Sequence, residues 1–266
     1  MSAPPSPAVR ADVVTRLRGA GCVFAEDEAE LLLATAATPA ELDTLVARRV
    51  AGEPLELIVG WAEFCGLRIA VAPGVFVPRR RTGFLVGRAA ALLRGAGSPV
   101  VVDLCCGTGA VGVALATAVG GAELHAADID PVAVRCARAN VAAVGGRVYA
   151  GDLYDALPEP LAGRVDVVVA NAPYVPAAEI PLMPPEARDH EPRTALDGGA
   201  DGLDVQRRVA TGALRWLTPG GALLIETSAR QAPRTRDAVI AGGLRAEIAR
   251  SADLDATVVI GRSPDH

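Results

Sequence analysis

The residues best suited to bind a small molecule are a glycine turn and an acidic residue some way beyond it. The turn lies within Val100–Val113, where an apolar run is followed by small residues at Cys105–Gly109 and then by the start of a helix. Asp128 ends a second apolar run, 21 positions after Gly107. This layout is typical of a nucleotide-binding βαβ unit, in which glycines let backbone N–H groups approach the ligand and the acid accepts the ribose hydroxyls. The glycines alone are a weak signal, because a tight turn needs them even where nothing binds.

A second motif, Asn171-Ala172-Pro173-Tyr174, directly follows the apolar run VDVVVA. An Asn residue near a proline also forms ordinary turns, so a purely structural turn is the alternative here. The position of the motif at the end of a buried strand favours a role in binding.

The segments around these residues alternate between the apolar spacing of a helix and that of a strand. Helices are expected near 109–119, 131–142, 202–216 and 230–241. Strands are expected near 99–104, 122–128, 147–150, 165–170 and 221–227. Such alternation predicts an α/β fold with a parallel, doubly wound sheet. Two further apolar segments, 244–250 and 256–261, have no helix between them and suggest a closing antiparallel hairpin.

The first third of the chain has a different pattern. Residues 1–8 form a Pro/Ser tail that we expect to be disordered, and apolar residues then recur at helical spacing up to about Val50. Thr38-Pro39-Ala40-Glu41 predicts a helix start, with Thr38 as cap and Glu41 completing a capping box. We expect a small helical domain of three or four helices over residues 1–60.

A connector follows the helical domain. Residues 61–72 and 75–77 look extended and are separated by the turn signal Pro73-Gly74, so we expect a β-hairpin connector over 61–80. A helix over about 82–94 then begins the main domain, 81–266.

Composition excludes several classes of function. All 26 basic residues are arginine, which rules out lysine chemistry, and the net charge is −5. The first 60 residues hold five arginines against nine acidic residues. Because nucleic-acid binding is driven by clustered basic residues, no stable nucleic-acid partner is expected. The uncharged stretch 104–122 is long enough to span a bilayer, but its glycines favour a strand, turn and helix, and no membrane partner is expected.

The five cysteines are odd in number and lack CxxC spacing. They fit buried thiols in a reducing cytosol, so we expect a cytoplasmic protein. Cys105 and Cys106 have no nearby histidine and are interpreted as small apolar fillers rather than nucleophiles. His125 is expected in the core, and His190-Glu191 has no metal-ligand spacing, so no metal is assigned.

From about residue 26 onward the chain resembles the protein-(glutamine-N5) methyltransferases of the release-factor type, the HemK/PrmC family of class I S-adenosylmethionine-dependent methyltransferases. The matching stretches are Gly52–Leu67 against GEPL…G..EF.GL, Pro73–Arg79 against PGVLIPR, Asp103–Gly109 against DLGTGTG, Asn171–Tyr174 against NPPY, and Glu191–Asp204 against the segment that follows it. The resemblance implies a Rossmann-like class I methyltransferase sheet and a small N-terminal helical domain that recognises the substrate.

The resemblance also implies the site. The cofactor S-adenosylmethionine would be held by Asp103, Cys105, Cys106, Gly107, Thr108, Gly109, Asp128, Asp152, Leu153 and Asn171. Asp128 would take the ribose hydroxyls, and Asp152 with Leu153 the adenine, although Asp152 could instead cap a helix or turn. Asn171, Ala172, Pro173 and Tyr174 would form the catalytic motif. In it the Asn171 Oδ1 and the Ala172 carbonyl each accept an amide N–H, and Tyr174 offers a flat face.

Three departures from the family pattern bear on the substrate. Cys105-Cys106 replace Gly-Thr in the turn, and Ala172 replaces the first proline of NPPY. Arg80–Gly83 replaces a stretch rich in glutamate, so an acidic residue near the cofactor is lost. The run Arg79–Arg81 could face cofactor, substrate or solvent, and a solvated surface run is the alternative to a binding role.

Three functions remain open at this point. The first is N5-methylation of a protein glutamine, usually in the Gly-Gly-Gln loop of a peptide-chain release factor, by an enzyme that need be no more than a monomer. The second is N-methylation of an exocyclic base amine in RNA or DNA. The third is a cofactor-binding paralogue that no longer catalyses, which the changes at Cys105 and Ala172 keep open.

Overall fold

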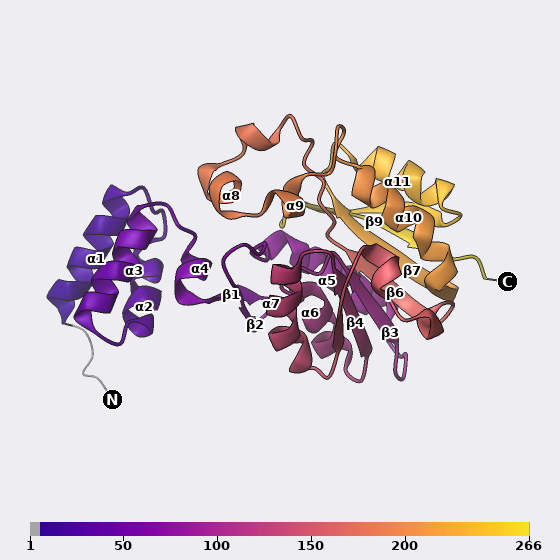
Figure 1. Cartoon of the computed structure of the whole chain (residues 1–266), viewed down its shortest axis with the longest axis horizontal. Coiled ribbons are helices and arrows are strands. Elements are labelled where there is room, and N and C mark those ends of the chain that lie inside the picture. Colours follow the sequence, from indigo (N-terminus) through magenta and orange to yellow (C-terminus); the bar gives the residue numbers. More distant parts are fainter. Residues whose placement is uncertain (1–5, 266) are drawn as a thin grey trace.

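The computed structural model describes residues 6–265, and its N-terminal part is a bundle of short helices at one end of the molecule (Figure 1). The helices are α1 (Pro7–Gly19), α2 (Ala25–Thr35), α3 (Pro39–Val50) and α4 (Leu55–Val59). They share a core of their own, in which Leu17, Leu32 and Val46 are fully buried.

Helices α1 and α3 of the N-terminal bundle each begin after a residue whose side chain caps the helix. Thr38 caps α3 as predicted, accepting a hydrogen bond from the Glu41 N–H at 3.2 Å, while the Glu41 carboxylate reaches back to the Ala37 N–H at 2.7 Å.

The tail predicted over residues 1–8 is wrong for Pro7 and Ala8, which belong to α1. The reason is that Ser6 caps this helix and a proline fits its first position. Residues 1–5 lie outside the described part.

The connector is a hairpin, but its turn is not the predicted one. Strand β1 (Trp61–Phe64) pairs antiparallel with β2 (Leu67–Ala70), so the turn is Cys65-Gly66 and not Pro73-Gly74. Both turn residues have positive φ, 52° and 77°, as a two-residue hairpin of the I′ type requires. Cysteine carries no turn signal, which is why the sequence pointed to the later glycine. Residues 75–77 form no strand, although Val75 and Val77 are buried.

The main domain contains a seven-stranded sheet of order β5-β4-β3-β6-β7-β9-β8. The strands are β3 (Val100–Leu104), β4 (Glu123–Asp128), β5 (Arg147–Ala150), β6 (Val165–Ala170), β7 (Leu217–Thr227), β8 (Arg245–Ser251) and β9 (Ala256–Arg262). The first five pair in parallel, whereas β9 pairs antiparallel with both β7 and β8. The parallel α/β sheet and its antiparallel closing hairpin are therefore confirmed.

Helices cover both faces of this sheet (Figure 1). On one face are α5 (Gly83–Leu92), α6 (Ala110–Val119) and α7 (Pro131–Ala142). On the other are α10 (Asp204–Trp216) and α11 (Ala232–Ala241). Each face has its own core: Leu115 packs among the residues of the first and Leu223 among those of the second. Strands buried on both faces explain the nearly continuous apolar runs.

The strand order reverses between β3 and β6, and ligands bind at such a switch point in open α/β sheets. The last residues of the two strands, Leu104 and Ala170, are paired neighbours. The glycine turn and the Asn171 motif therefore start side by side. Between β6 and α10 the chain forms the short helices α8 (Pro185–His190) and α9 (Arg193–Leu196), which the sequence did not predict.

Within residues 6–265 no helix combines the length and apolar character needed to cross a bilayer. The uncharged stretch 104–122 is divided between the end of β3, the turn and α6.

Candidate active site

A cavity of about 370 Å³ lies at the switch point of the sheet. It brings together nearly all the site residues that the sequence pointed to, from four strand ends far apart in the chain. Those that line it are Asp103, Cys105, Cys106, Gly107, Thr108, Asp128, Asp152, Leu153, Asn171, Ala172, Pro173 and Tyr174. Gly109 is the exception, and its place is explained by packing.

The two glycines of the turn serve different purposes. Gly107 has φ +56°, and a Cβ built on it would meet nothing within 4 Å, so its backbone is open toward the cavity that it lines. Gly109 has φ +77°, and a Cβ there would lie 2.7 Å from Cγ2 of Val141 in α7. Gly109 is therefore needed for close helix packing, whereas Gly107 leaves its backbone open toward the cavity.

Asp128 ties the end of β4 to the glycine turn. Its Oδ2 accepts a hydrogen bond from the Gly107 N–H at 2.8 Å, and its Oδ1 accepts one from the Asp130 N–H at 2.9 Å. Burial raises the pKa of this carboxyl, while the backbone hydrogen bonds oppose the rise. The carboxylate thus reaches the cavity in a fixed orientation.

Asp103 faces the start of α6. Its Oδ2 accepts a hydrogen bond from the Gly112 N–H at 2.8 Å, and a Cβ on Gly112 would lie 3.0 Å from the same oxygen. Burial raises the pKa of Asp103 to about 7, because desolvation penalises the charged form more than the Gly112 hydrogen bond favours it. Asp103 therefore positions the helix behind the turn.

Asp152 lies beside a cavity arginine. Its carboxylate accepts a hydrogen bond from Nη2 of Arg208 in α10 at 2.6 Å. Its side chain makes no capping hydrogen bond, so the capping alternative for this residue is wrong. The following residue, Leu153, has φ 49° and lines the cavity beside it.

The two adjacent thiols lie in the wall of the cavity, with Cys105 half-buried and Cys106 buried. Desolvation, followed by the neighbouring carboxylates, raises the pKa of both Cys105 and Cys106. A thiol needs a lowered pKa to act as a nucleophile. These two side chains therefore serve as protonated, largely apolar lining. His125 is likewise buried, with its ring nitrogens 2.9 Å from the Tyr149 hydroxyl and 3.1 Å from Glu123, as a core histidine.

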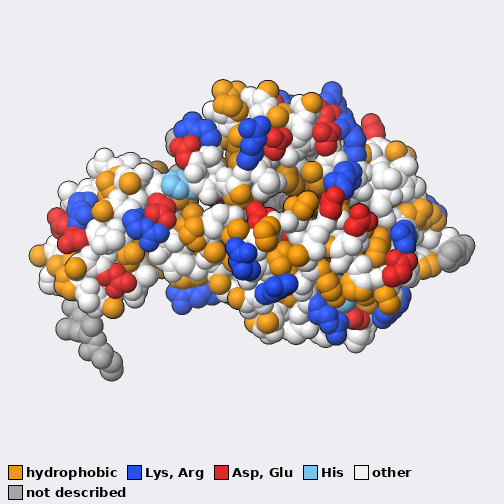
Figure 2. Space-filling model, viewed as in Figure 1, with side chains coloured by type: hydrophobic (Ala, Val, Ile, Leu, Met, Phe, Trp, Pro, Cys, Tyr) orange, Lys and Arg blue, Asp and Glu red, His pale blue; other side chains and the backbone are white. Residues whose placement is uncertain are grey.

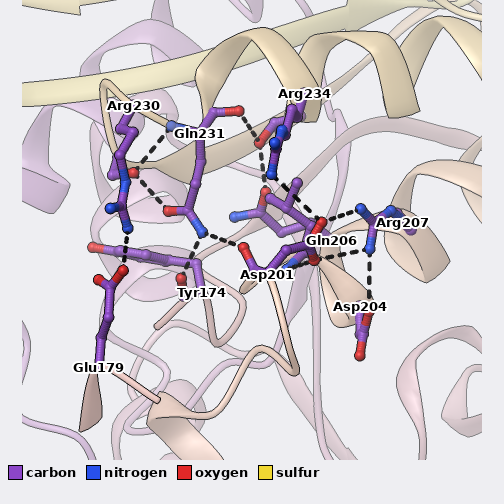
Figure 3. Close-up of polar contacts among 12 residues, drawn as sticks. Tyr174, Glu179, Asp201, Asp204, Gln206, Arg207, Arg230, Gln231 and Arg234 are labelled. Carbon is purple, nitrogen blue, oxygen red and sulfur yellow. Dashed lines mark hydrogen bonds and ion pairs between the residues drawn. The ribbon is translucent and has the colours of Figure 1, made fainter. Parts of the chain in front are cut away.

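The Asn171–Tyr174 motif is held from outside by Gln231, which the sequence did not single out, and is approached closely by Gly202. Nε2 of Gln231 donates hydrogen bonds to the carbonyl oxygens of Tyr174, at 2.8 Å, and Asp201, at 3.1 Å (Figure 3). A Cβ on Gly202 would lie 2.4 Å from the Tyr174 oxygen. The glycine-rich run at 198–202 was the available signal for this close approach. Nothing around Gln231 in the sequence indicates its role.

The three arginines of the run Arg79–Arg81 do not all face the cavity. Arg79 forms an ion pair with the buried carboxylate of Glu191, and its guanidinium lies 5.2 Å from the ring centre of Phe76. Arg81 Nη2 donates a hydrogen bond to the Tyr174 hydroxyl at 2.8 Å. Both line the cavity, whereas Arg80 is exposed and does not. The solvated-run interpretation is therefore wrong for Arg79, whereas Arg81 lines the cavity with 47% of its side chain exposed.

Behind these arginines lies a buried acid, Glu226, near the end of β7. It is 2% exposed, and its Oε1 is 3.5 Å from Nε of Arg81. Burial raises the pKa of Glu226, and the Arg81 charge opposes that rise. The acid thus anchors one edge of the Arg81 guanidinium.

Comparison with known proteins identifies relatives of several kinds. The family model of the methyltransferase small domain matches residues 68–182. The release factor glutamine methyltransferase of Streptomyces coelicolor is 44% identical over 184 residues, which are 68% of this chain and 65% of that protein. The one from Bradyrhizobium diazoefficiens is 34% identical over 267 residues, which are 92% and 90% of the two chains.

A relative with a different acceptor matches about as well. The 4-amino-L-phenylalanine/4-methylamino-L-phenylalanine methyltransferase of Streptomyces pristinaespiralis is 41% identical over 230 residues, 84% of this chain and 77% of that protein. Among solved structures, the Thermus thermophilus 16S rRNA N2 G1207 methyltransferase in complex with AdoMet and guanosine has a TM-score of 0.54 at 21% identity. It covers 76% of this chain and 49% of that one. This last likeness concerns the fold alone.

The alignments and the sheet agree. The chain has the strand order and closing hairpin of a Rossmann-like class I methyltransferase. Its alignment with the Bradyrhizobium diazoefficiens protein covers 92% of this chain and 90% of that one. The protein belongs to the release factor glutamine methyltransferase family.

Proposed function

We propose that this protein transfers a methyl group from S-adenosylmethionine to the side-chain amide nitrogen of a glutamine, in the Gly-Gly-Gln loop of a peptide-chain release factor. One observation carries the proposal: the glycine turn after β3 and the Asn171 motif after β6 line the same cavity. Because Leu104 and Ala170 are paired, a cofactor on the turn and an acceptor on the motif would be immediate neighbours.

The residues of the cavity fit this cofactor. Gly107 has open space where a Cβ would stand, so its backbone can approach a ligand. The Asp128 carboxylate is held for the ribose hydroxyls, and Asp152 with Leu153 lies where the adenine would be bound. The bound cofactor would supply an electrophilic methyl group on a positively charged sulfonium.

The protein's own contribution is to present the acceptor nitrogen. An amide nitrogen is a poor nucleophile because its lone pair is delocalised, so it has to be held in line with the methyl group and shielded from water. The Asn171 Oδ1 and the Ala172 carbonyl can accept its two N–H groups. Ala172 is 1% exposed. A main-chain acceptor survives the loss of the usual proline, and the clamp by Gln231 compensates for the freedom that alanine adds.

In this proposal the helical domain, residues 1–60, recognises the protein substrate, the connector spans 61–80 and the transferase domain 81–266. A groove lined by Phe24, which directly precedes α2, by Leu31 of α2 and by Pro184 runs between the helical bundle and the segment before α8. Phe24 is 68% exposed, as expected of a side chain that packs against a partner. Acidic and basic side chains are interspersed over the face seen in Figure 2, which does not suit a nucleic-acid strand.

A second candidate acceptor is the aromatic amine of a free amino acid. The 41% identity to the Streptomyces pristinaespiralis enzyme, over 84% of this chain, favours it as strongly as the alignments favour the first candidate. An aromatic amine is also a planar NH2 group with a delocalised lone pair. The same two acceptors would hold it.

The test is methyl transfer from radiolabelled S-adenosylmethionine to three acceptors: a release factor, the same factor with its Gly-Gly-Gln glutamine replaced by alanine, and 4-amino-L-phenylalanine. The Asn171→Ala enzyme is assayed beside the wild type, and calorimetry follows cofactor binding in both. Because Asn171 orients the acceptor, its loss should lower kcat by about 100-fold or more. Cofactor affinity should change much less.

Label on the native factor, absent from its alanine variant, supports glutamine methylation. Label on 4-amino-L-phenylalanine alone would replace it with the second candidate. Cofactor binding without label on any acceptor would contradict both and leave a cofactor-binding paralogue.

A further inference from the structure

Arg81 is the cavity arginine that is held most loosely. It belongs to the short 3₁₀ turn Arg80–Thr82 before α5. Its Nη2 donates to the Tyr174 hydroxyl at 2.8 Å, and its Nε lies 3.5 Å from Glu226. Nη1 hydrogen-bonds to none of residues 6–265, and 47% of the side chain is exposed.

The other cavity arginines are already neutralised. Arg208 makes a 2.6 Å hydrogen bond to Asp152. Arg79 is paired with Glu191, whose side chain is 3% exposed, and its guanidinium is 5.2 Å from the Phe76 ring centre. Of the three cavity arginines, Arg81 therefore lies farthest from its carboxylate partner. One edge of its guanidinium makes no hydrogen bond within residues 6–265.

The surroundings of Arg81 favour an incoming anion. The counter-charge behind it is Glu226, which is 2% exposed, and burial raises the pKa of that carboxyl. Burial also raises the pKa of the Tyr174 hydroxyl, so that neighbour stays neutral. Arginine offers paired N–H donors that match the two oxygens of a carboxylate.

We propose that Arg81 forms a subsite for the α-carboxylate of an amino-acid group at the acceptor end of the cavity. The inference rests on the proposed methyl-transfer function, under which two such groups would meet beside Tyr174. One is the methionine part of the cofactor and the other is a free amino-acid acceptor. Tyr174 connects the subsite directly to the acceptor motif.

The test measures binding of matched ligands by calorimetry in two arms. The cofactor arm compares S-adenosylmethionine with its decarboxylated analogue. The acceptor arm, in the presence of S-adenosylhomocysteine, compares 4-amino-L-phenylalanine with 4-(2-aminoethyl)aniline, which lacks the carboxylate. The variants are Arg81→Gln, Arg81→Lys and, as the control, Arg80→Gln, since Arg80 is the exposed neighbour outside the cavity.

In at least one arm the wild type should bind the carboxylate ligand about tenfold or more tightly than its analogue, the usual size for a charged hydrogen bond. Arg81→Gln should remove this preference, Arg81→Lys should keep part of it, and Arg80→Gln should keep all of it. Loss in the cofactor arm assigns the subsite to methionine, and loss in the acceptor arm assigns it to the acceptor. If Arg81→Gln matches Arg80→Gln in both arms, the proposal is wrong.

Two features keep the result interpretable. Arg81→Gln leaves the buried Glu226 without its cation, so the double variant Arg81→Gln/Glu226→Gln is measured as well and should also lack the preference. Both arms follow binding and not turnover. Failure of methyl transfer to every acceptor would therefore contradict the proposed function without affecting the subsite. An Arg81→Gln variant that binds all ligands like Arg80→Gln would contradict the subsite without affecting the proposed function.

Discussion

The side-chain amide of Gln231 donates a hydrogen bond to the main-chain carbonyl oxygen of Tyr174 at 2.8 Å, across 57 positions of sequence. Gln231 is 5% exposed and directly precedes α11, and its Oε1 accepts a hydrogen bond from Ser228 Oγ at 2.6 Å. The start of one helix therefore fixes the loop that follows a different strand. This makes Gln231 a positioning residue for the acceptor motif.

Replacing Gln231 with alanine should leave the partly buried carbonyls of Tyr174 and Asp201 without their donor. We expect a loss of about 1–3 kcal/mol in the free energy of unfolding, measured with urea. We also expect a larger rise in KM for the acceptor than for the cofactor. The matched control is Arg230→Ala, which breaks only the exposed pair with Glu179 and should cost less than about 1 kcal/mol. Equal urea midpoints for the two variants would rule out the clamp.

Cys105 has φ 54°, in the left-handed region that disfavours residues with a Cβ. Cys105→Gly should therefore raise the free energy of unfolding by about 0.5–1 kcal/mol, the relief of strain less the entropy that glycine adds. Cys105→Ala serves as the control, because it removes the thiol but keeps the Cβ. A glycine variant that unfolds at lower urea concentration than the alanine variant would contradict the strain argument.

Asp103 should make stability depend on pH. Its pKa is raised from 3.8 to about 7 in the folded protein, so between these values the unfolded chain has lost a proton that the folded protein keeps. Stability should fall as pH rises through this window, by at most about 1.4 kcal/mol per pH unit, and level off above pH 7.

Asp103→Asn, which carries no titrating group, should lack this component. The measurement is urea unfolding of both proteins at pH 5 and pH 8. The stability of the wild type relative to the variant should be lower at pH 8. Other buried carboxyls, such as Glu226, are present in both proteins and cancel. A difference that is the same at the two pH values would mean that Asp103 is ionised in the folded protein throughout.

Gly112 in α6 packs against β3 and β4 without room for a side chain. A Cβ there would lie 2.9 Å from Cδ1 of Leu124 and 3.0 Å from Oδ2 of Asp103. Gly112→Ala should destabilise the protein by about 1–3 kcal/mol through overpacking. Gly87→Ala in α5 is the control, since nothing lies within 4 Å of its Cβ, and it should stabilise by about 0.5–1 kcal/mol. Thermal unfolding of both variants checks the opposite signs.

Much of the molecule could be predicted from local patterns. Apolar runs located the seven strands, and the inner ones, such as β3 and β6, stand out because they are buried on both sides. Helical periodicity located the helices on both sheet faces. The glycine turn, Asp128 and the Asn171 motif were found because their residue types are needed wherever backbone approaches a ligand. Where the local signal was misleading, as at Pro73-Gly74, a cysteine with positive φ formed the turn instead.

The sequence by itself determined the seven strands of the main sheet and the two motifs, the glycine turn and Asn171–Tyr174, that line the cavity. The tertiary structure alone decided which partners hold those residues. Gln231 on Tyr174, Glu226 behind Arg81, and Arg208 on Asp152 are contacts between segments more than 50 positions apart. The reason is physical: hydrophobic periodicity acts within a few residues along the chain, whereas a hydrogen bond or ion pair depends on where packing brings two side chains together in space.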